Sequence, residues 1–459
     1  MPLGPRPFAA RRQRIDRCRR AVLRGRDGLD RRWWAVALLA AGVFALLQLL
    51  AGPQVVMNGD SQEYGRLALQ ITGMPRTAAA EAAADAACWS REYAAERVTA
   101  VDPVRFQHPG RGGDARVRAC ERAARAATGS FVHPGPAFAR YETIFDGRIG
   151  YPLLAVPAVW SFGVLRGLWI TSVLCTAAAG FLVAALLAAS GLGAWAALAG
   201  ELLYLCGPPG RWGVHPLAEG ALNAAALLTL LGAGWLLQRR LGAGLLTWAA
   251  GLVLVALVKY SSGLLLALAL LVAAGGCALT VRGTRHLGTA LLAAGSAVAM
   301  PATMLITSAL GLPGLLVTVQ DTFTRHFHRP DVAHPLSMLL TLNLRFWGAF
   351  LGWQAAAPAL LAGLAAGLFL LFRRRPQLGW LAVAGTLLGV LTVVAHPVVY
   401  EYQRLGVLWW LPAVLGLPLL VEGYLALRRR ARSERGRGPS PARPAASAQP
   451  TRYARNSSA

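Results

Sequence analysis

Charged residues are rare in the apolar stretches of this chain, and the few that border them are the candidates for chemistry. Asp60 follows the first apolar stretch, within "NGDSQEYGRLA". Glu63 and Tyr64 stand three and four residues later, so the three side chains can share one face of a helix. A partly desolvated carboxylate there can act as a general base, and it can equally cap the helix that follows. The residues alone leave both interpretations open.

Two cationic residues stand beside apolar segments further along the chain. Lys259 is the single lysine and interrupts "LVLVALVKYSSGLLLALALLV". A charge at the centre of a bilayer costs roughly 2.5 to 3.5 kcal/mol and less near a helix end. Arg404 precedes the last apolar segment in "YEYQRLGVLWW", and a guanidinium fork suits phosphate. Both residues are therefore candidates to bind an anionic head group, with anchoring at the membrane interface as the alternative.

Histidines and a further acidic residue fall in the polar connections. Glu219 opens an apolar segment in "HPLAEGALNAA" and could serve as a second acid, a metal ligand or an N-terminal helix charge. The stretch "RHFHRPDVAHP" holds His326, His328 and Asp331. This set could ligate a divalent metal, yet its spacing matches no helical zinc motif. A metal cofactor is therefore left open, and no other cofactor is indicated. Since no phosphate-cradling glycine motif occurs, a nucleotide-driven reaction is not expected.

The composition indicates the class of protein that must position these residues. Of 459 residues, 55% are apolar and 15% are charged, which predicts an all-α polytopic membrane protein. The net charge of +25 could suggest nucleic acid, but eleven arginines precede Trp33 and nine follow Leu427. Flanking arginines are typical of cytoplasmic segments next to anionic lipid. The expected partners are therefore membrane lipids, with no nucleic acid.

The distribution of arginines also decides the topology. Residues 151–163 are short for a span and contain two prolines, so we expect a helix on the outer surface there. Both termini then become cytoplasmic: a basic segment at 1–32, a transmembrane domain at 33–427 with a large first outer loop at 54–165, and a disordered basic tail at 428–459. The ten expected spans cover residues 33–53, 166–189, 194–209, 218–237, 242–259, 261–279, 287–310, 348–372, 378–395 and 405–427.

The cysteines carry a separate expectation about the first outer loop. The chain has six cysteines and no C-x-x-C pair, which gives no support to a thioredoxin-like or zinc site. Cys88 and Cys120 share the loop and can form a disulfide if it faces an oxidising compartment. This pairing requires their Cα atoms to come within about 4.4 to 6.8 Å of each other.

Four short motifs occur in an order that resembles a known family. They are "GDSQEYGRLA" after the first span, "GRIGYPLLAVP" at the surface segment, "VKYSSGLLL" at a middle span and "YEYQRLGVLWWLPAVLG" at the last one. Over roughly residues 33–424 the chain resembles the GT-C superfamily of membrane glycosyltransferases. These enzymes use polyprenyl-phosphate sugars. The protein O-mannosyltransferases and the aminoarabinose transferase of lipid A, which are glycosyltransferase family 39-like, are the members it looks most like.

The resemblance implies a GT-C-like fold of about ten transmembrane helices and an inverting sugar transfer at the extracytoplasmic face of the cell membrane. Asp60 would be the general base, and Arg148, Lys259 and Arg404 would lie near the donor phosphate. The acceptor would be a cell-envelope glycan, lipid or protein. The chain has one acid where some relatives have two, which leaves the metal question open. Candidate contacts to the sugar or acceptor are Glu63, Tyr64, Tyr151, His215, Glu219, His326 and His328.

Three other functions compete with this expectation. A secondary transporter or flippase of lipid-linked sugars would place ionisable groups near the bilayer midplane, between two related halves. A glycan polymerase or ligase with a polyprenyl-diphosphate donor would share the arginines and the outer face, with less need of a base at Asp60. A non-catalytic envelope-assembly protein would use the first outer loop as its interaction surface and would tolerate changes at Asp60.

Overall fold

The computed structural model describes residues 33–104, 115, 117–122, 136–324, 326–327 and 329–435. Helices make up all regular secondary structure within these ranges, which confirms the all-α expectation. The elements are α2 (Trp33–Ala51), α3 (Gly59–Ile71), α4 (Arg76–Val101), α7 (Pro136–Asp146), α8 (Gly150–Ala189), α9 (Ala194–Cys206), α10 (Pro208–Gly213), α11 (Glu219–Leu237), α12 (Leu241–Val258), α13 (Tyr260–Thr280), α14 (Leu287–Ala309), α15 (Leu315–Thr324), α16 (Pro335–Ala356), α17 (Ala359–Arg374), α18 (Pro376–Ala395), α19 (Tyr402–Leu405), the 3₁₀ turn η1 (Val407–Trp410), α20 (Leu411–Gly416) and α21 (Pro418–Arg435).

The described chain forms a multi-pass membrane architecture. Eight helices are long and apolar enough to cross a bilayer, or nine if the bent pair α16 and α17 counts as one span. The sequence predicts ten. The expected span at 194–209 becomes α9, whose 13 residues extend only about 20 Å at 1.5 Å per residue. The expected span at 348–372 is divided between α16 and α17, which are bent by 88° at residues 357–358.

Helix α8 contains the predicted short helix at 151–163. Its backbone reverses at Gly163, where φ is +76° and ψ is 171°, a conformation that glycine adopts most readily. The two halves then pack so closely that a Cβ on Gly167 would lie 2.4 Å from the Val159 backbone. The Tyr151 hydroxyl secures this hairpin, since it donates to the Leu168 carbonyl at 2.9 Å and lies 2.8 Å from the Ser172 hydroxyl.

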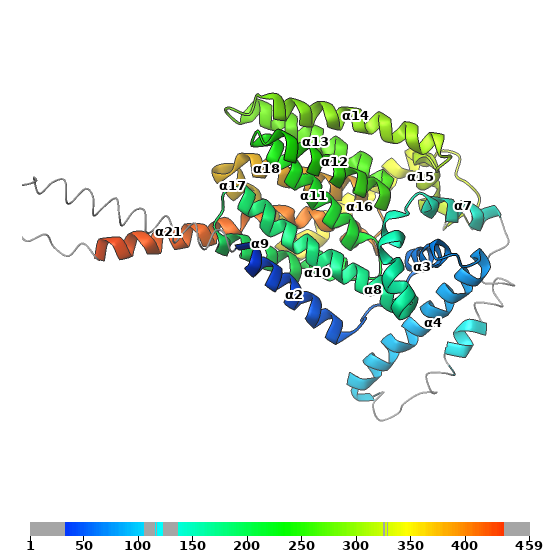
Figure 1. Ribbon diagram of the computed structural model, residues 1–459. Coiled ribbons are helices and arrows are strands. Elements are labelled where there is room, and N and C mark those ends of the chain that lie inside the picture. The colour runs from blue at the N-terminus through cyan, green and yellow to red at the C-terminus, as the bar shows by residue number, and fades with distance from the viewer. Residues whose placement is uncertain are drawn as a thin grey trace, which may run out of the picture.

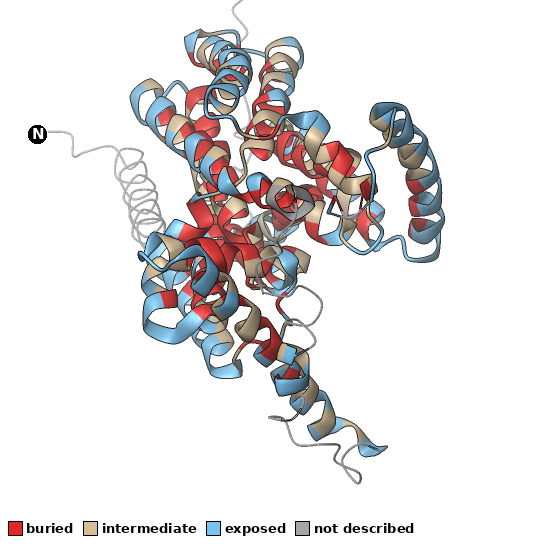
Figure 2. Cartoon of the chain, turned by 90° about the vertical axis from the view of Figure 1, so that its right-hand side faces the viewer, coloured by how far each residue is buried: buried red, intermediate tan, exposed pale blue. Residues whose placement is uncertain are grey.

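The core of the bundle lies between α8, α11, α13 and α18. Figure 2 shows buried residues concentrated in the middle of the molecule and exposed residues on its outer faces. The largest cluster consists mainly of leucine and alanine, including Leu186, Leu227, Leu230, Leu270 and Leu388. Small side chains let helices approach closely, which supplies the van der Waals contact that drives helix packing in a membrane.

The two ends of the bundle differ in charge. Helices α3, α4, α7 and α15 gather at one end in Figure 1, and α21 extends from the opposite end. Arg239 and Arg282 follow α11 and α13, which run away from the first end, and Arg373 lies in the last turn of α17. Helix α21 continues to Arg435, so residues 428–435 of the predicted tail are helical. The segments 1–32 and 436–459 lie outside the described residues.

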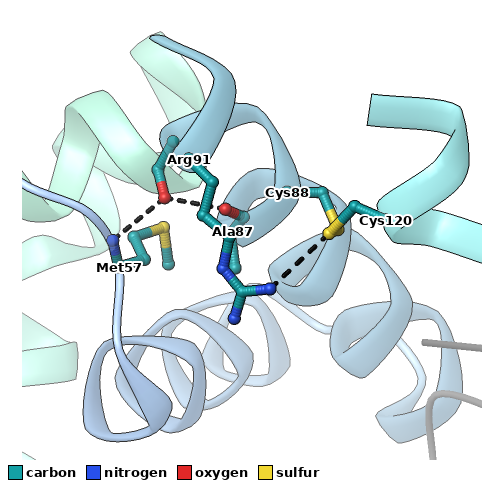
Figure 3. Close-up of a disulfide and its surroundings, with 6 residues drawn as sticks. Met57, Ala87, Cys88, Arg91 and Cys120 are labelled. Carbon is teal, nitrogen blue, oxygen red and sulfur yellow. Dashed lines mark hydrogen bonds between the residues drawn. A yellow bond between two sulfur atoms is a disulfide. The ribbon is translucent and has the colours of Figure 1, made fainter. Parts of the chain in front are cut away.

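Helix α4 forms contacts with neighbouring segments at the end of the bundle where α3 lies. The Met57 N–H donates to the Ser90 hydroxyl at 2.9 Å, just before α3 begins. Cys88 and Cys120 are joined by a disulfide with their Cα atoms 5.8 Å apart (Figure 3). These contacts connect α4 to the segment preceding α3 and to residues 117–122.

A buried ion-pair network joins α3 to α7. Arg66 contacts Glu63 at 2.8 Å and Glu142 at 3.6 Å, and Glu142 also pairs with Arg76 at the start of α4. Buried charges are tolerated when they are paired in this way. The network therefore fixes α7 relative to α3, and both helices contribute to the cavity described below.

Candidate functional site

A cavity of about 580 Å³ lies at the end of the bundle where α3 and α7 pack. Its lining includes Asp60, Arg148, Lys259 and Arg404. These four residues come from segments far apart in the chain, and the structure brings all of them together. Three cations and a carboxylate thus share one space.

Each of the four residues stands at the border of a helix. Asp60 lies in the first turn of α3, which Asn58 caps by accepting from the Ser61 N–H at 2.9 Å. Arg148 connects α7 to α8, and Arg404 belongs to α19. Lys259 has an extended backbone between α12 and α13. Since these helices end on the same side of the bundle, their terminal residues converge there.

Arg404 is the central charge of the site and is surrounded by carboxylates. Its guanidinium contacts Asp60 Oδ2 at 3.0 Å, Glu401 Oε2 at 2.9 Å and Glu219 Oε1 at 3.5 Å, and its side chain is only 7% exposed. A buried guanidinium requires such partners. This arrangement gives Glu219, which does not line the cavity, the role of orienting Arg404.

The charges around Asp60 keep it ionised. Burial alone would raise the pKa of this carboxyl, but the positive charges of Arg404 and Arg148 outweigh burial and lower the pKa. The Tyr141 hydroxyl lies 3.4 Å from Asp60 Oδ1 and donates to it. The result is an oriented, ionised carboxylate inside the cavity, and its lowered pKa makes it a weaker base than the desolvated carboxylate expected from the sequence.

Lys259 and Arg148 are the cavity cations that form no direct ion pair within the described ranges, although both feel the charge of Asp60. In the described ranges Lys259 makes no ion pair within 4.0 Å, and burial together with the charge of Arg148 lowers its pKa to about 8. Arg148 lies near the Tyr64 hydroxyl, and its buried Nε has no hydrogen-bond partner. Two cavity cations that form no direct ion pair favour an anionic ligand.

Part of the cavity lining is apolar. Leu264 and Leu265 of α13, Met304 of α14, and Leu312 and Leu315 near α15 form it. Met304 is 62% exposed and Leu315 is 66% exposed, so the cavity reaches the outer surface of the bundle. An apolar chain attached to an anion could enter by this route and remain in contact with lipid.

Other predicted residues lie beneath or beside the cavity. Tyr64 and Tyr151 are buried and their rings pack edge to face with centroids 5.2 Å apart. Glu63 is outside the cavity lining and pairs with Arg66. His215 packs against Trp212 with ring centroids 4.7 Å apart, and burial lowers its pKa to about 4. These four side chains support the walls of the site.

The predicted histidine stretch contributes one residue to the cavity wall. His326 Nδ1 lies 3.1 Å from Asp321 Oδ1, and this hydrogen bond raises the pKa of the imidazole. Its ring packs against Tyr141 with centroids 4.4 Å apart. His328 lies outside the described residues. Among those that are described, no three His, Cys, Asp or Glu side chains are grouped so as to hold a metal ion.

Several residues of the cavity were not predicted from the sequence. They are Tyr141, Asp321, His396 and Glu401. Glu401 is three residues before Arg404, a spacing that could have indicated an ion pair. Tyr141 reaches Asp60 over 81 positions, and no local pattern signals such a contact.

No protein-family model matches the chain, and comparisons with curated proteins and with solved structures find no similar protein. Conclusions about function therefore depend on the geometry and charges of the cavity.

Proposed function

We propose that this protein is an integral membrane glycosyltransferase of the GT-C type. It transfers a sugar from a polyprenyl-phosphate donor to a cell-envelope glycan, lipid or protein. The observation that carries the proposal is that Asp60 shares one cavity with three cations, Arg148, Lys259 and Arg404. A base, an anion site and an apolar wall are the three features that this reaction requires.

The donor phosphate binds between Arg148 and Lys259, the two cavity cations that form no direct ion pair. Its polyprenyl chain follows the apolar wall past Leu265 and Met304. When the bond between the anomeric carbon and the phosphate oxygen breaks, a phosphodiester monoanion becomes a phosphate monoester dianion. The two cations stabilise the charge that develops on this leaving group.

Asp60 acts on the other substrate. A sugar or protein hydroxyl is a weak nucleophile, so a carboxylate that takes its proton as the new bond forms accelerates the attack. The acceptor oxygen bonds to the anomeric carbon, the proton goes to Asp60, and the lipid phosphate leaves. One displacement of this kind inverts the anomeric configuration. Arg404 and Tyr141 hold the carboxylate in orientation.

The charge at the bundle ends supports an extracytoplasmic site in the cell membrane. The paired and clustered arginines at 239–240, 282–285 and 373–375 stand at the end remote from the cavity, and such clusters favour the cytoplasm. Both chain termini are then cytoplasmic. Acceptors in the envelope have direct access to the cavity in this orientation.

The location of the ionisable groups favours an enzyme over the competing functions. Transporters of charged substrates place these groups near the bilayer midplane, whereas Asp60, Lys259 and Arg404 all border helix ends. A flippase needs no proton acceptor beside the phosphate site. An assembly protein needs neither group.

A transfer assay with purified protein in lipid nanodiscs tests the proposal. Radiolabelled polyprenyl-phosphate sugars are offered with envelope extracts as acceptors, for the wild type, Lys259→Gln and the control Arg91→Gln. Arg91 is exposed on α4 and contacts Cys120, far from the cavity lining. The expected result is transfer with inversion that Lys259→Gln weakens in both kcat and donor KM, because Lys259 binds the phosphate and stabilises it as it leaves. Arg91→Gln should leave transfer unchanged. Donor binding without transfer to any acceptor, together with movement of the donor across the bilayer, would establish the flippase function instead.

A further inference from the structure

Helix α4 carries a row of side chains spaced four residues apart: Trp89, Tyr93, Arg97 and Val101, called here the α4 row. Trp89 is 51% exposed and Val101 is 82% exposed. Two members of the row touch the end of span α2. Arg97 Nη1 donates to the Ala51 carbonyl at 2.7 Å, and a Cβ on Gly52 would lie 2.9 Å from the Tyr93 hydroxyl.

The length of α2 fixes the depth of this contact. Its 19 residues extend about 28 Å at 1.5 Å per residue, which matches the roughly 30 Å hydrocarbon core of a bilayer. Ala51, the last residue of α2, therefore lies at the boundary between hydrocarbon and head groups. Since Tyr93 and Arg97 contact this end of the span, these two members of the row lie at the same depth. Figure 1 shows α4 passing obliquely beside the end of α2.

The chemistry of the row suits this depth. Trp and Tyr concentrate at membrane interfaces because their rings are apolar and one edge is polar, and arginine pairs with anionic head groups. Leu47 and Leu50, in the last turn of α2 or next to it, are also exposed. We propose that the α4 row is a docking surface for the interfacial region of the lipid bilayer, which anchors α4 to the membrane surface.

This contact would also position the segment that precedes α3. Ser90, which follows Trp89, accepts from the Met57 N–H, and Asn58 then caps α3. A membrane-anchored α4 thus holds the start of α3 at a fixed height above the bilayer. The proposal does not depend on sugar transfer and can fail or succeed independently of it.

Site-specific fluorescence in nanodiscs tests the docking surface. The four cysteines outside the disulfide are first replaced by serine, and Trp89→Cys and Val101→Cys are then labelled with a polarity-sensitive probe. The control is Glu81→Cys, an exposed position on the first half of α4. We expect the probes at 89 and 101 to emit at shorter wavelength and to be quenched several-fold more by shallow than by deep doxyl lipids. The probe at 81 should be quenched by neither.

Two outcomes would overturn the proposal. Quenching at 89 and 101 no greater than at 81 would place the row in water. Short-wavelength emission without quenching by any doxyl lipid would mean that another protein surface covers the row. Because Val101 is the most exposed member, its variant decides the question even if Trp89→Cys does not fold.

Discussion

Arg404 Nη1 donates to Asp60 Oδ2 at 3.0 Å and thereby joins residues 344 positions apart in the chain. The same guanidinium contacts Glu401 and Glu219, so its charge is already balanced by carboxylates. Arg404 is therefore suited to hold Asp60, and in the proposed function the donor phosphate is assigned to Arg148 and Lys259. This division of roles leads to different expectations for the three cations.

The Arg404→Lys variant distinguishes the effect of the positive charge at this position from the effect of the guanidinium geometry. Arg404→Lys keeps the positive charge but loses the fork that contacts several carboxylates at once. We expect a folded protein whose kcat falls about 10²-fold because Asp60 is no longer oriented, with KM for the donor nearly unchanged. Steady-state kinetics in nanodiscs measures this split. A large rise in donor KM at constant kcat would instead assign Arg404 to the phosphate.

Arg404→Ala is expected to act on the fold. It leaves Asp60, Glu219 and Glu401 without their shared partner, and breaking a buried ion pair costs about 3 to 5 kcal/mol. Thermal unfolding followed by light scattering should show a clearly lower melting temperature than for Arg404→Lys. Equal melting temperatures for the two variants would mean that the carboxylates do not depend on this charge.

The lowered pKa of Lys259 predicts that kcat/KM for the donor decreases at alkaline pH. Its pKa is lowered from 10.5 to about 8, so the ammonium is present below about pH 8 and lost above it. The value of kcat/KM, which reports ionisations of the free enzyme, should therefore fall as the pH rises above about 8. Lys259→Arg keeps its charge throughout this range, and its profile should stay flat there. The same alkaline decline in both proteins would exclude Lys259 as its source.

The disulfide is expected to stabilise the helices around α3 without taking part in the reaction. Cys88 and Cys120 are 32 positions apart. Closing a loop of this length lowers the entropy of the unfolded chain, which in the loop-entropy model raises the free energy of unfolding by about 3 to 4 kcal/mol. The double variant Cys88→Ser and Cys120→Ser should melt at a lower temperature. Since the contact between Met57 and Ser90 remains, kcat well below that temperature should change little. A reducing agent should lower the melting temperature of the wild type alone; an equal effect on the double variant would contradict the assignment.

Part of the site could be predicted because charge is costly beside apolar segments. Asp60, Lys259 and Arg404 interrupt or border such segments, which makes them conspicuous without any knowledge of the fold. Arg148 is predicted as a site residue only through the resemblance of "GRIGYPLLAVP" to a family motif. All four residues line the cavity.

The remaining features depend on packing between distant segments. Tyr141 reaches Asp60, and Thr322 lies 2.7 Å from His396 Nδ1 across 74 positions, contacts that no local pattern encodes. Pro358 indicates the bend between α16 and α17 in the sequence, because proline disfavours a helical conformation at the residue before it. The short α9 likewise ends where Gly207 precedes two prolines. A prediction from hydropathy alone misses such local breaks and therefore gives continuous spans.

The role of Asp60 as the general base is tested most directly by sugar transfer with the Asp60→Asn variant, measured together with donor binding. The amide keeps the size of the carboxylate but cannot accept the proton of the acceptor hydroxyl. The control is Asp146→Asn, an exposed carboxylate of α7 that pairs with Arg66 and lies outside the cavity lining. Asp60→Asn should bind the labelled donor but lose transfer by at least about 10²-fold, whereas Asp146→Asn should behave as the wild type. Undiminished transfer by Asp60→Asn would contradict the role of Asp60 and require a different base.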